Sequence, residues 1–463
     1  MAGSILGFPV LTFLVLGLLA LLARTPPERV VARSAGLTFG LSLLATLATF
    51  TTMELGRQTK LVLGFGPWFQ VGGYDFEITL LLDRLSLPFL LLTSTAAWLI
   101  GVFSVRYLHR DPGFVRFFAL LMLFACGMLL IVLAGNLDVL IVGWELVGLA
   151  SSLLISFFHH RKEPVRNGLR AFVTYRICDM GLMGAAGLIH HYAHAASFGP
   201  AFEVGGDAGA LAALPAHVAP WVGLLLVFAA MGKSAQVPFS GWLPRAMEGP
   251  TPSSAIFYGT LSIHAGSFLL LRAQPVLERA PAACILLVVI GLLTSVHGTM
   301  SGRVQADAKT SLAYASMCQV GLILVEIGLG LPRVAMVHLL GHACLRTVQF
   351  LRAPSLMQDL RRVEAAAGGP MGPTGQHIER LLPLRVQRFL YHLSVERGHL
   401  DTFLEMLLVQ PFLRVGQALD GLEQRWLMLL SRKAGWLGRL GRAVVPAVLR
   451  ERFKSLMAPR SAP

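Results

Sequence analysis

The sequence has few charged residues and few cysteines. Of its 463 residues only 14% are charged, whereas a soluble domain of this length carries about a quarter. The five cysteines stand singly in apolar segments, and no Cys-x-x-Cys pair occurs. They are Cys126, Cys178, Cys284, Cys318 and Cys344. This pattern provides neither a disulfide framework nor a zinc site, so no cofactor is expected in this chain.

A signature of nucleic-acid binding is also missing. The net charge is +14, but no basic patch is combined with stacking aromatics or a nucleic-acid-binding motif. No nucleic acid is therefore expected as a partner. The excess of Lys and Arg is instead typical of the cytoplasmic loops of membrane proteins.

Long apolar runs fill most of the chain. Hydrophobic residues make up 55% of it and the mean hydropathy is +0.65. Runs of about 20 apolar residues cross a bilayer as helices, because lipid offers the backbone no hydrogen-bond partner. We expect an all-α polytopic membrane protein with about eleven transmembrane helices. The expected spans are 5–23, 36–55, 85–105, 114–134, 137–158, 167–189, 219–237, 252–272, 281–300, 311–330 and 333–352.

Charges in the loops predict the orientation. Basic residues gather in alternate loops, at Arg24, Arg29 and Arg33, at Arg106, Arg110 and Arg116, and at His159–Arg166. The loop 190–218 has Glu203 and Asp207 and neither Lys nor Arg. The positive-inside rule then places the N-terminus in the periplasm and the C-terminal tail in the cytoplasm of a bacterium, with the chain in the inner membrane. The first segment lacks a basic n-region and a cleavage site, so it is expected to stay as a span.

Two segments differ from the spans. Residues 57–80, punctuated by glycines, predict an external β-hairpin. The glycine- and proline-rich run 368–375 predicts a linker, and Phe403–Leu430 predicts an amphipathic helix on the membrane surface or against a partner. The expected divisions are 1–113 with the hairpin, a first helix bundle 114–272, a partial second bundle 273–352, and a cytoplasmic linker and tail 353–463.

Ionisable side chains inside the spans are the main functional signal. A charge in mid-bilayer costs at least about 2.5–3.5 kcal/mol and usually faces a polar pathway. Glu145 is a candidate to hold and release a proton, with a structural ion pair as the alternative. Lys233 is a second candidate, because a buried lysine readily loses its proton; snorkelling from the span end is its alternative. Pro238 and Pro244 predict that this seventh helix is broken, as at other ion sites.

Further charged residues lie in the sixth and tenth spans. Arg176 and Asp179 are one turn apart and either serve the pathway or simply neutralise each other. Lys309 and Asp307 stand at the entry to the tenth span, where anchoring at the interface is the alternative. Glu326 lies deeper in that span and is another candidate proton site.

Histidines add a polar helix face in the eleventh span. His338, His342 and Arg346 recur every four residues and line one face. Histidine titrates near neutral pH, so this face predicts a proton path. His264 stands alone, and a hydrogen-bonded core histidine is its alternative. No carboxylate or thiol joins the histidines at ligand spacing, so no metal site is expected.

Together these residues predict ion translocation, with the proton as the expected ion. The residues of the expected proton path are Glu145, Lys233, Lys309, His338 and His342. The supporting residues are Arg176, Asp179, His264, Glu326 and Arg346. Aligned across the bundle, the path residues would form a polar axis at mid-membrane depth.

From the N-terminus to the eleventh span, the chain resembles a known family. These are the antiporter-like subunits of respiratory complex I, above all its L subunit, and of multisubunit cation/proton antiporters. The segments that carry the resemblance are Gly143–Gly148, Gly232–Pro244, Gly249–Ala255 and Lys309–Ser316, with the hairpin and the tail opening Leu400–Leu413 similar to the L subunit. The resemblance implies that Glu145 and Lys233 are the proton-handling glutamate and lysine. It also implies that Lys309 is the bridging lysine and that His338 and His342 are the histidines of the eleventh helix.

Three departures from the family pattern favour one branch. Arg346 stands where the family has lysine, and arginine does not release its proton. Tyr258 stands where the family has a histidine, and no apolar span that would give a second broken helix follows Arg352. The run Glu248–Gly259 resembles the DabB membrane subunits of DAB-type inorganic carbon pumps. The partner that this implies is a DabA-like, zinc-containing subunit related to carbonic anhydrases.

Three functional hypotheses remain at this stage, and in each the chain is a transporter subunit and not an enzyme. The first is the proton-conducting membrane subunit of an energy-coupled inorganic carbon (CO2/bicarbonate) accumulation complex. The second is a proton-translocating subunit of a complex I-like NADH:quinone oxidoreductase or a hydrogenase-type complex. The third is a subunit of a Na⁺/H⁺ antiporter. The expected partners are a further protein subunit, membrane lipid, and protons or other cations; a purely structural scaffold fits worst, given the cost of so many buried charges.

Overall fold

The structure is a computed structural model that describes residues 2–22, 24–71, 74–202, 209–369, 381–404, 406–407 and 410–433. It divides into two compact units, Met1–Gly398 and His399–Pro463. The divisions expected at 113, 272 and 352 stay predictions. Glu203, Asp207 and most of the expected linker lie outside the described residues.

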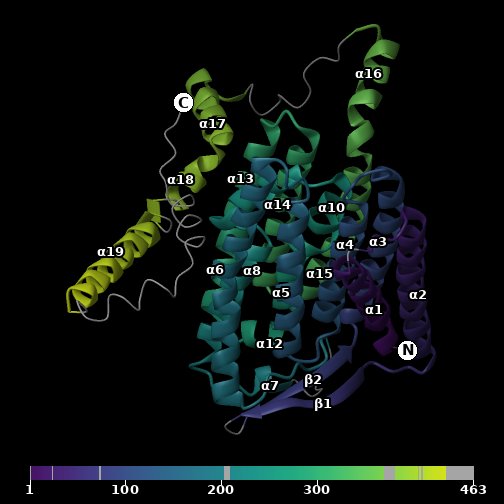
Figure 1. Ribbon diagram of the computed structural model, residues 1–463, viewed down its shortest axis with the longest axis vertical. Coiled ribbons are helices and arrows are strands. Elements are labelled where there is room, and N and C mark those ends of the chain that lie inside the picture. Colours follow the sequence, from purple (N-terminus) through teal and green to yellow (C-terminus); the bar gives the residue numbers. More distant parts are fainter. Residues whose placement is uncertain are drawn as a thin grey trace. The chain divides into compact units, whose positions relative to one another are not determined.

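The first unit is a bundle of membrane-crossing helices (Figure 1). Within the described residues, ten helices are long and apolar enough to cross a membrane, and α8 is a shorter apolar helix. This confirms the prediction of a multi-pass, all-helical membrane protein. The spans are α1 (Ala2–Leu21), α2 (Glu28–Leu55), α3 (Ser86–Tyr107), α4 (Phe114–Leu133), α5 (Leu137–Ile155), α6 (Lys162–Ala193), α8 (Ala219–Lys233), the segment Thr251–Arg272, α13 (Pro281–Arg303), α14 (Ala308–Gly328) and α15 (Pro332–Arg352). Shorter helices of this unit are α7 (Gly209–Ala212), α12 (Gln274–Leu277), α16 (Leu356–Ala367) and α17 (Leu384–Val395).

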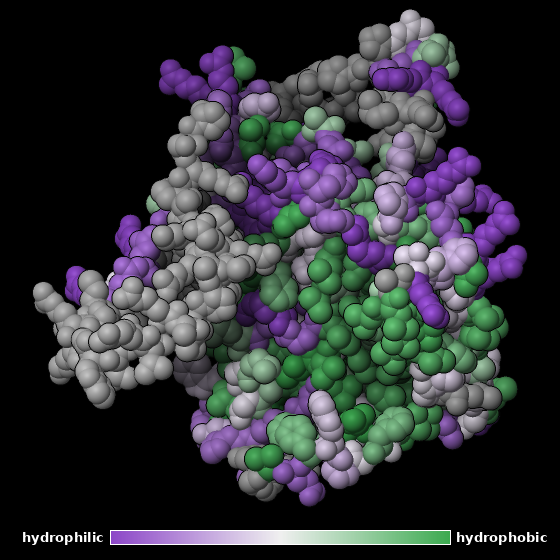
Figure 2. Space-filling model, viewed as in Figure 1, coloured by the Kyte–Doolittle hydropathy of each residue, from purple (hydrophilic) through white to green (hydrophobic). Residues whose placement is uncertain are grey.

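Hydrophobic side chains cover the middle of the helices, as lipid contact requires. Figure 2 shows this apolar surface, with hydrophilic side chains gathered at the end of the bundle away from the two strands. The start of the chain lies at the same end of the bundle as the strands (Figure 1). Which end faces the cytoplasm stays a prediction.

The seventh helix ends earlier than its apolar run suggests. α8 stops at Lys233, and Ala235 takes a positive φ of 51°. The chain continues as a 3₁₀ turn at Phe239–Gly241, α9 (Trp242–Arg245) and a second 3₁₀ turn at Ala246–Glu248. Pro238 directly precedes the first turn, where its missing N–H costs no hydrogen bond. Pro244 lies inside α9, so the interruption comes before both prolines.

The eighth span is also irregular, although the sequence predicts one continuous helix. α10 (Thr251–Ser254) leads into a π-helical turn at Ala255–Thr260, a 3₁₀ turn at Ser262–His264 and then α11 (Ala265–Arg272). The hydroxyl of Thr260 donates to the carbonyl oxygen of Ala255 at 2.9 Å. Such a local side-chain bond competes with the regular helical ladder. Single π turns of this kind often mark functional sites.

Two antiparallel strands stand where the hairpin is expected. β1 (Leu61–Val71) pairs with β2 (Tyr74–Leu82). The turn between α4 and α5 is tied to β2, since Nδ2 of Asn136 donates to the carbonyl oxygen of Glu77 at 2.6 Å. Asn136 also caps α5 by accepting from the N–H of Val139 at 2.9 Å. One side chain thus fixes both the hairpin and the start of the helix that carries Glu145.

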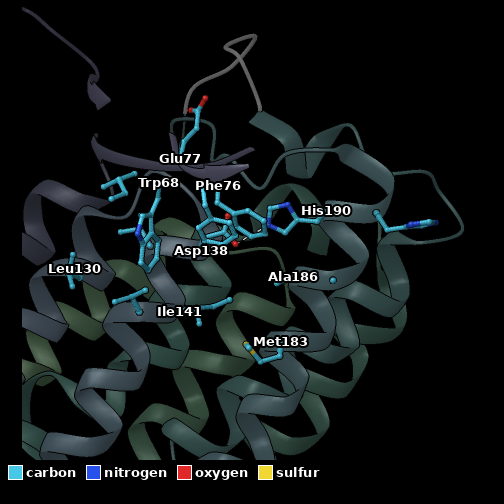
Figure 3. A pocket seen from close by; sticks show the side chains of 15 residues that line it. Trp68, Phe76, Glu77, Leu130, Asp138, Ile141, Met183, Ala186 and His190 are labelled. Carbon is cyan, nitrogen blue, oxygen red and sulfur yellow. Dashed lines mark hydrogen bonds and ion pairs between the residues drawn. The ribbon is translucent and has the colours of Figure 1, made fainter. Parts of the chain in front are cut away.

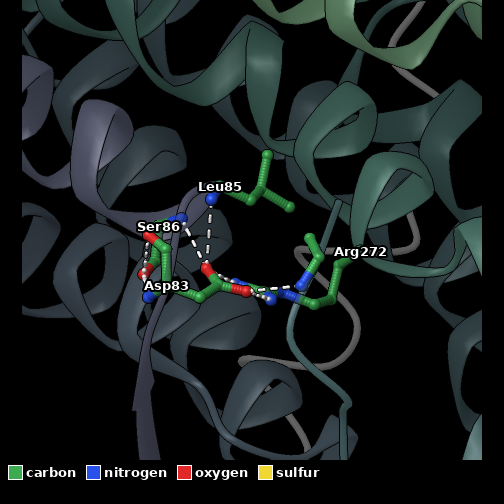
Figure 4. A network of polar contacts seen from close by, with 5 residues as sticks. Asp83, Leu85, Ser86 and Arg272 are labelled. Carbon is green, nitrogen blue, oxygen red and sulfur yellow. Dashed lines mark hydrogen bonds and ion pairs between the residues drawn. The ribbon is translucent and has the colours of Figure 1, made fainter. Parts of the chain in front are cut away.

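A buried ion pair joins the end of β2 to the eighth span (Figure 4). Nη1 of Arg272 lies 2.5 Å from Oδ2 of Asp83, and both side chains are almost fully buried. Main-chain N–H groups of Ser86 and Ala201 also donate to this carboxylate, each at 2.8 Å. Burial acts to raise the pKa of Asp83, but the charge of Arg272 and these hydrogen bonds outweigh it, so the pKa lies below its usual value.

The second unit contains α18 (Leu400–Leu404) and α19 (Gln410–Lys433). On α19, four large apolar side chains are spaced three or four residues apart and are exposed. They are Val415, Leu419, Leu422 and Trp426. The helix expected at Phe403–Leu430 is therefore present from Gln410 onward and is amphipathic. Its binding to the membrane or to a partner stays a prediction.

Candidate functional site

The interruption after α8 leaves Lys233 deep inside the bundle. Its side chain is 1% exposed, and Nζ donates to the main-chain oxygen of Trp144 at 2.9 Å. The ammonium also lies 4.5 Å from the ring centroid of Tyr175 and 5.2 Å from that of Trp144. Aromatic faces stabilise a cation more strongly when water is excluded. Within the described residues no carboxylate pairs with this lysine.

Gly148 makes room for this ammonium group. A Cβ at position 148 would lie 2.8 Å from Nζ of Lys233, closer than real contacts allow. α5 therefore places a carbonyl acceptor and an open surface one turn apart, at Trp144 and Gly148. Both belong to the segment Gly143–Gly148 that the sequence analysis singled out.

A charged cluster lies next to Trp144. Arg176 donates to Glu145 through Nη1 and, at 2.7 Å, to Oδ2 of Asp179 through Nη2. The indole N–H of Trp144 donates to Oδ1 of Asp179 at 2.5 Å. Asp179 is buried, whereas the side chains of Glu145 and Arg176 are about one third exposed. The structure thus brings Glu145, Arg176 and Asp179 together.

Lys233 and Glu145 were expected on one proton path, and the link between them is indirect. Glu145 is bound by Arg176, and Lys233 by the carbonyl of Trp144. Trp144 is the residue common to both groups, through its ring and its main chain. With both carboxylates ionised and both cations charged, the four side chains are neutral overall. Sequence reasoning missed Trp144 and Tyr175 as functional residues, because aromatic residues in a span are usually core.

A row of aromatic rings extends from Lys233 toward the eighth span. The Trp242 ring centroid lies 4.9 Å from that of Tyr175 and 5.6 Å from that of Tyr258. The indole N–H of Trp242 donates to the carbonyl of Gly232 at 3.0 Å, which caps the end of α8. The hydroxyl groups of Tyr175 and Tyr258 are buried and bind no other described residue. The row of rings therefore contains two polar groups, the first of them on the ring beside Lys233.

The two buried histidines form a continuous chain of hydrogen bonds. Nδ1 of His264 lies 2.8 Å from the carbonyl oxygen of Thr260, and Nε2 of His264 lies 2.9 Å from Nδ1 of His342. Nε of Arg346 donates to Nε2 of His342 at 3.2 Å. The irregular turn explains the first bond, because the main-chain N–H of His264 binds Leu261 and leaves the Thr260 carbonyl to the ring.

These contacts fix the proton positions on both neutral rings. A carbonyl only accepts, so Nδ1 of His264 carries hydrogen and its Nε2 accepts. Nδ1 of His342 must then donate to His264, and Nε2 of His342 accepts from Arg346. All three bonds point the same way, from Arg346 toward Thr260. Of these three bonds only the one between the two rings can reverse, because the Thr260 carbonyl cannot donate and Arg346 cannot accept. A proton that crosses this bond must therefore enter and leave the rings through groups other than Arg346 and Thr260.

His338 belongs to a separate pair on α14 and α15. Its Nδ1 lies 2.8 Å from Oε1 of Glu326 and its Nε2 lies 3.0 Å from Oε1 of Gln319. The rings of His338 and His342 are 6.5 Å apart and share no hydrogen bond in the described chain. Both Glu326 and His338 are partly exposed. Gln319 was not among the predicted site residues.

Lys309 lies at a surface cavity and not beside Lys233. Nζ of Lys309 donates to the carbonyl oxygens of Met247 at 2.7 Å and Gly249 at 3.0 Å. A cavity of about 560 Å³ opens there, lined also by Glu248 and Asp307. Oδ2 of Asp307 accepts from the N–H of Thr310 at 2.8 Å and so caps α14. Direct contacts thus group the predicted residues into separate clusters, and one axis through all of them stays a prediction.

A larger apolar pocket lies between the hairpin and helices α4, α5 and α6 (Figure 3). Its volume is about 850 Å³. Trp68 and Phe76 point from the hairpin toward Ile141 (Figure 3). At its polar end Nε2 of His190 lies 2.9 Å from Oδ1 of Asp138. Sequence reasoning missed this pair, since neither residue stood out among the charges inside the spans.

No group of three or more potential metal ligands occurs among the residues that the structure describes. The absence of a cofactor nevertheless stays a prediction, as does the zinc expected on a partner.

Comparison with known proteins points to one family. The model of the NADH:quinone oxidoreductase/Mrp antiporter transmembrane family matches residues 134–368, just over half of the chain. The model of the N-terminus of chain 5 of NADH-ubiquinone oxidoreductase (complex I) matches residues 68–118. The first match includes every residue of the expected proton path.

Curated relatives agree with these matches. NADH-quinone oxidoreductase subunit L of Mycobacterium tuberculosis is 39% identical over 303 residues, which are 64% of this chain and 47% of that protein. NADH-ubiquinone oxidoreductase chain 5 of Chondrus crispus is 32% identical over 333 residues, 70% of this chain and 50% of that protein. The chain therefore spans about half the length of the curated relatives it matches.

Solved structures have the same fold. A chain of the Mrp complex from a Dietzia species has a TM-score of 0.64 and 27% identity, with 82% of this chain and 40% of that chain covered. A chain of respiratory complex I from Thermus thermophilus has a TM-score of 0.64 and 21% identity, with 77% of this chain and 72% of that chain covered. At this identity the comparison shows a likeness of fold alone. The chain belongs to the family of NADH:quinone oxidoreductase and Mrp antiporter membrane subunits.

Proposed function

We propose that this chain is a proton-translocating membrane subunit of a multisubunit complex of the NADH:quinone oxidoreductase or Mrp antiporter type. The observation that carries the proposal is Lys233, a fully buried lysine held by a carbonyl and two aromatic rings without a paired carboxylate. A lysine that is buried in this way alternates between charged and neutral forms more easily than one locked in an ion pair. Chemistry other than ion transfer is assigned to partner subunits.

The charged cluster supplies the second part of the proposal. Glu145 and Arg176 reach the surface of the chain, and Trp144 contacts both sides, through its indole N–H to Asp179 and through its main-chain oxygen to Lys233. Protons pass between this cluster and Lys233, then along the buried tyrosines toward His264 and His342. Water at the Tyr175 and Tyr258 hydroxyls would bridge the part of the path that lacks direct contacts.

The test is proton movement by the assembled complex in liposomes. The complex with Lys233→Ala is compared with the unchanged complex and with Lys60→Ala, a lysine exposed just before the hairpin. We expect Lys233→Ala to abolish proton movement and Lys60→Ala to preserve it. Full proton movement by a correctly assembled Lys233→Ala complex would refute the proposal.

The comparisons favour a respiratory or Mrp-type complex over the inorganic carbon complex that was the leading hypothesis from sequence. The carbon-accumulation role remains a second proposal, supported by Tyr258, which stands where the family pattern has a histidine and which lies buried beside Trp242. Its test is growth in ambient air of a bacterium that lacks carbonic anhydrase and expresses this chain with a DabA-like, zinc-containing subunit. Failure of a well-expressed pair to grow would exclude that role.

The coupled ion is tested separately. A strain that lacks this chain is grown at rising sodium concentration and rising pH. Sodium sensitivity would assign a Na⁺/H⁺ antiporter complex of the Mrp type. Growth unaffected by sodium would leave a proton-only subunit of a respiratory complex.

A further inference from the structure

One face of α15 combines exposed apolar residues with polar residues at membrane depth. The exposed apolar side chains are Val334, Val337, Leu345 and Val348, with Gly341 among them. They recur every three or four residues and so form one stripe along the helix. A Cβ at Gly341 would meet no atom within 4 Å. We call this stripe the α15 face.

Arg346 lies beside this stripe and has no carboxylate partner. Its Nε donates to His342 and its Nη1 donates to Oε1 of Gln349 at 2.7 Å. Among the described residues it forms no ion pair. It is half-buried, so its charge is neither compensated inside the bundle nor free in water.

The position of Arg346 makes this charge costly. Arg346 precedes the helix end at Arg352 by six residues, which is about 9 Å along the axis. Its guanidinium is held between His342 and Gln349, so it does not extend to the interface. An isolated arginine inside a span costs at least about 2.5–3.5 kcal/mol.

The neighbouring carboxylate does not solve this problem. Glu326 binds His338 through Oε1, and its Oε2 is buried without a partner among the described residues. Glu326 therefore does not compensate the charge of Arg346, and the α15 face lies beside an unpaired cation. Packed transmembrane helices in contact typically share small residues and polar bonds.

We propose that the α15 face binds a transmembrane helix of a partner subunit, and that this helix presents a carboxylate to Arg346. Lipid tails carry no acceptor, and lipid phosphates lie at the bilayer interface, whereas Arg346 is held about 9 Å before the end of α15. A second copy of this chain suits the face less well. Its carboxylates in the middle of the described spans already have partners, those of Glu145 and Asp179 in Arg176 and that of Glu326 in His338. Glu54 and Glu163 lie at the ends of α2 and α6.

The test uses the whole complex in native membranes. A photo-crosslinking amino acid replaces Val337, and the crosslinked peptide is sequenced. A matched probe replaces Val289 on α13, which is similarly exposed but remote in sequence. We expect the Val337 probe to capture an apolar helix of another subunit that contains an Asp or Glu.

Charge variants decide whether this carboxylate is the reason for binding. Arg346→Glu should lower the yield of the Val337 adduct several-fold, and Arg346→Lys should keep most of it. Changing the captured acidic residue to Lys should restore the adduct in Arg346→Glu. Arg346→Gln, which can still bind His342, controls for misfolding, and the Val289 adduct should not change.

Several outcomes would overturn the proposal. Adducts with lipid only, with a second copy of this chain, or with a helix that has no acidic residue would each exclude it, as would an adduct indifferent to Arg346→Glu. The readout is a covalent adduct and not proton movement, so the partner helix and the proposed function can fail independently.

Discussion

Nζ of Lys233 donates a 2.9 Å hydrogen bond to the carbonyl oxygen of Trp144. The lysine is thus held by an uncharged acceptor in a place from which water is excluded. Burying the ammonium group costs desolvation that a carbonyl partner offsets only in part, and an apolar residue of similar size removes that cost. Function and stability should therefore respond in opposite directions when this lysine is replaced.

Lys233→Met tests this relationship. We expect proton movement by the complex to be lost, while the temperature of unfolding of the chain stays the same or rises. Proteoliposome assays and thermal unfolding in detergent measure the two properties. Lys60→Met, at an exposed position, should change neither. A large loss of stability in Lys233→Met would mean that the lysine holds the fold together instead of carrying protons.

Gly148→Ala tests the space around the ammonium group. The new Cβ would lie 2.8 Å from Nζ, so Lys233 has to move away from Trp144. Because Nζ is the end of a flexible side chain, this shift should cost little stability, whereas proton movement should fall. Gly187→Ala in α6 is the matched control, because a Cβ there meets nothing within 4 Å. That variant should gain about 0.5–1 kcal/mol from helix propensity.

Much of the fold follows from the sequence, because lipid leaves the backbone few options. Apolar runs of sufficient length become helices, so the number of spans is predictable. The π-helical turn before His264 is not, since it depends on the Thr260 side chain competing with the ladder. The same turn brings His264 to His342, so the best-connected part of the site arises from the least predictable element.

The candidate site was predictable in its residues but not in its contacts. A charged residue in a span is visible in the sequence, which is how Glu145, Lys233 and His342 were found. Which helix faces meet is not visible, so Glu145, Lys233 and Lys309 were placed on one axis. Trp144 joins the two charged groups through its ring and its carbonyl, and no sequence pattern distinguishes it from a core tryptophan.

Arg176→Gln should expose the repulsion between Glu145 and Asp179. Arg176 donates to both carboxylates, and its loss leaves two like charges close together, one of them buried. We expect a loss of about 1–3 kcal/mol in the free energy of unfolding. The double variant with Asp179→Asn should recover part of it, because only one carboxylate remains ionised. Thermal unfolding of the two variants measures this difference, and equal stabilities would contradict the shared role of Arg176.

His342→Gln separates titration from hydrogen bonding. Glutamine can donate to His264 and accept from Arg346, as the neutral histidine does, but it does not bind a proton near neutral pH. We expect a change in stability of less than about 1 kcal/mol and a clear loss of proton movement. His342→Phe, which breaks both bonds, should lose stability as well. If His342→Gln transports protons normally, His342 is structural.

The pair Asp83–Arg272 should govern stability in a way that depends on pH. Arg272→Met leaves the Asp83 carboxylate buried without its cation, which costs about 3–5 kcal/mol. The double variant Asp83→Asn with Arg272→Met should recover most of this loss. The pKa of Asp83 is lower in the folded chain than in the unfolded chain, where it is about 4. The carboxylate therefore stabilises the fold above about pH 4, and this stabilisation is lost as the pH falls through the pKa of the folded chain. The unfolding temperature of the unchanged chain should therefore drop below about pH 4 more steeply than that of Asp83→Asn. Thermal unfolding at a series of pH values measures both slopes, and parallel slopes would show that this pair does not set the acid stability.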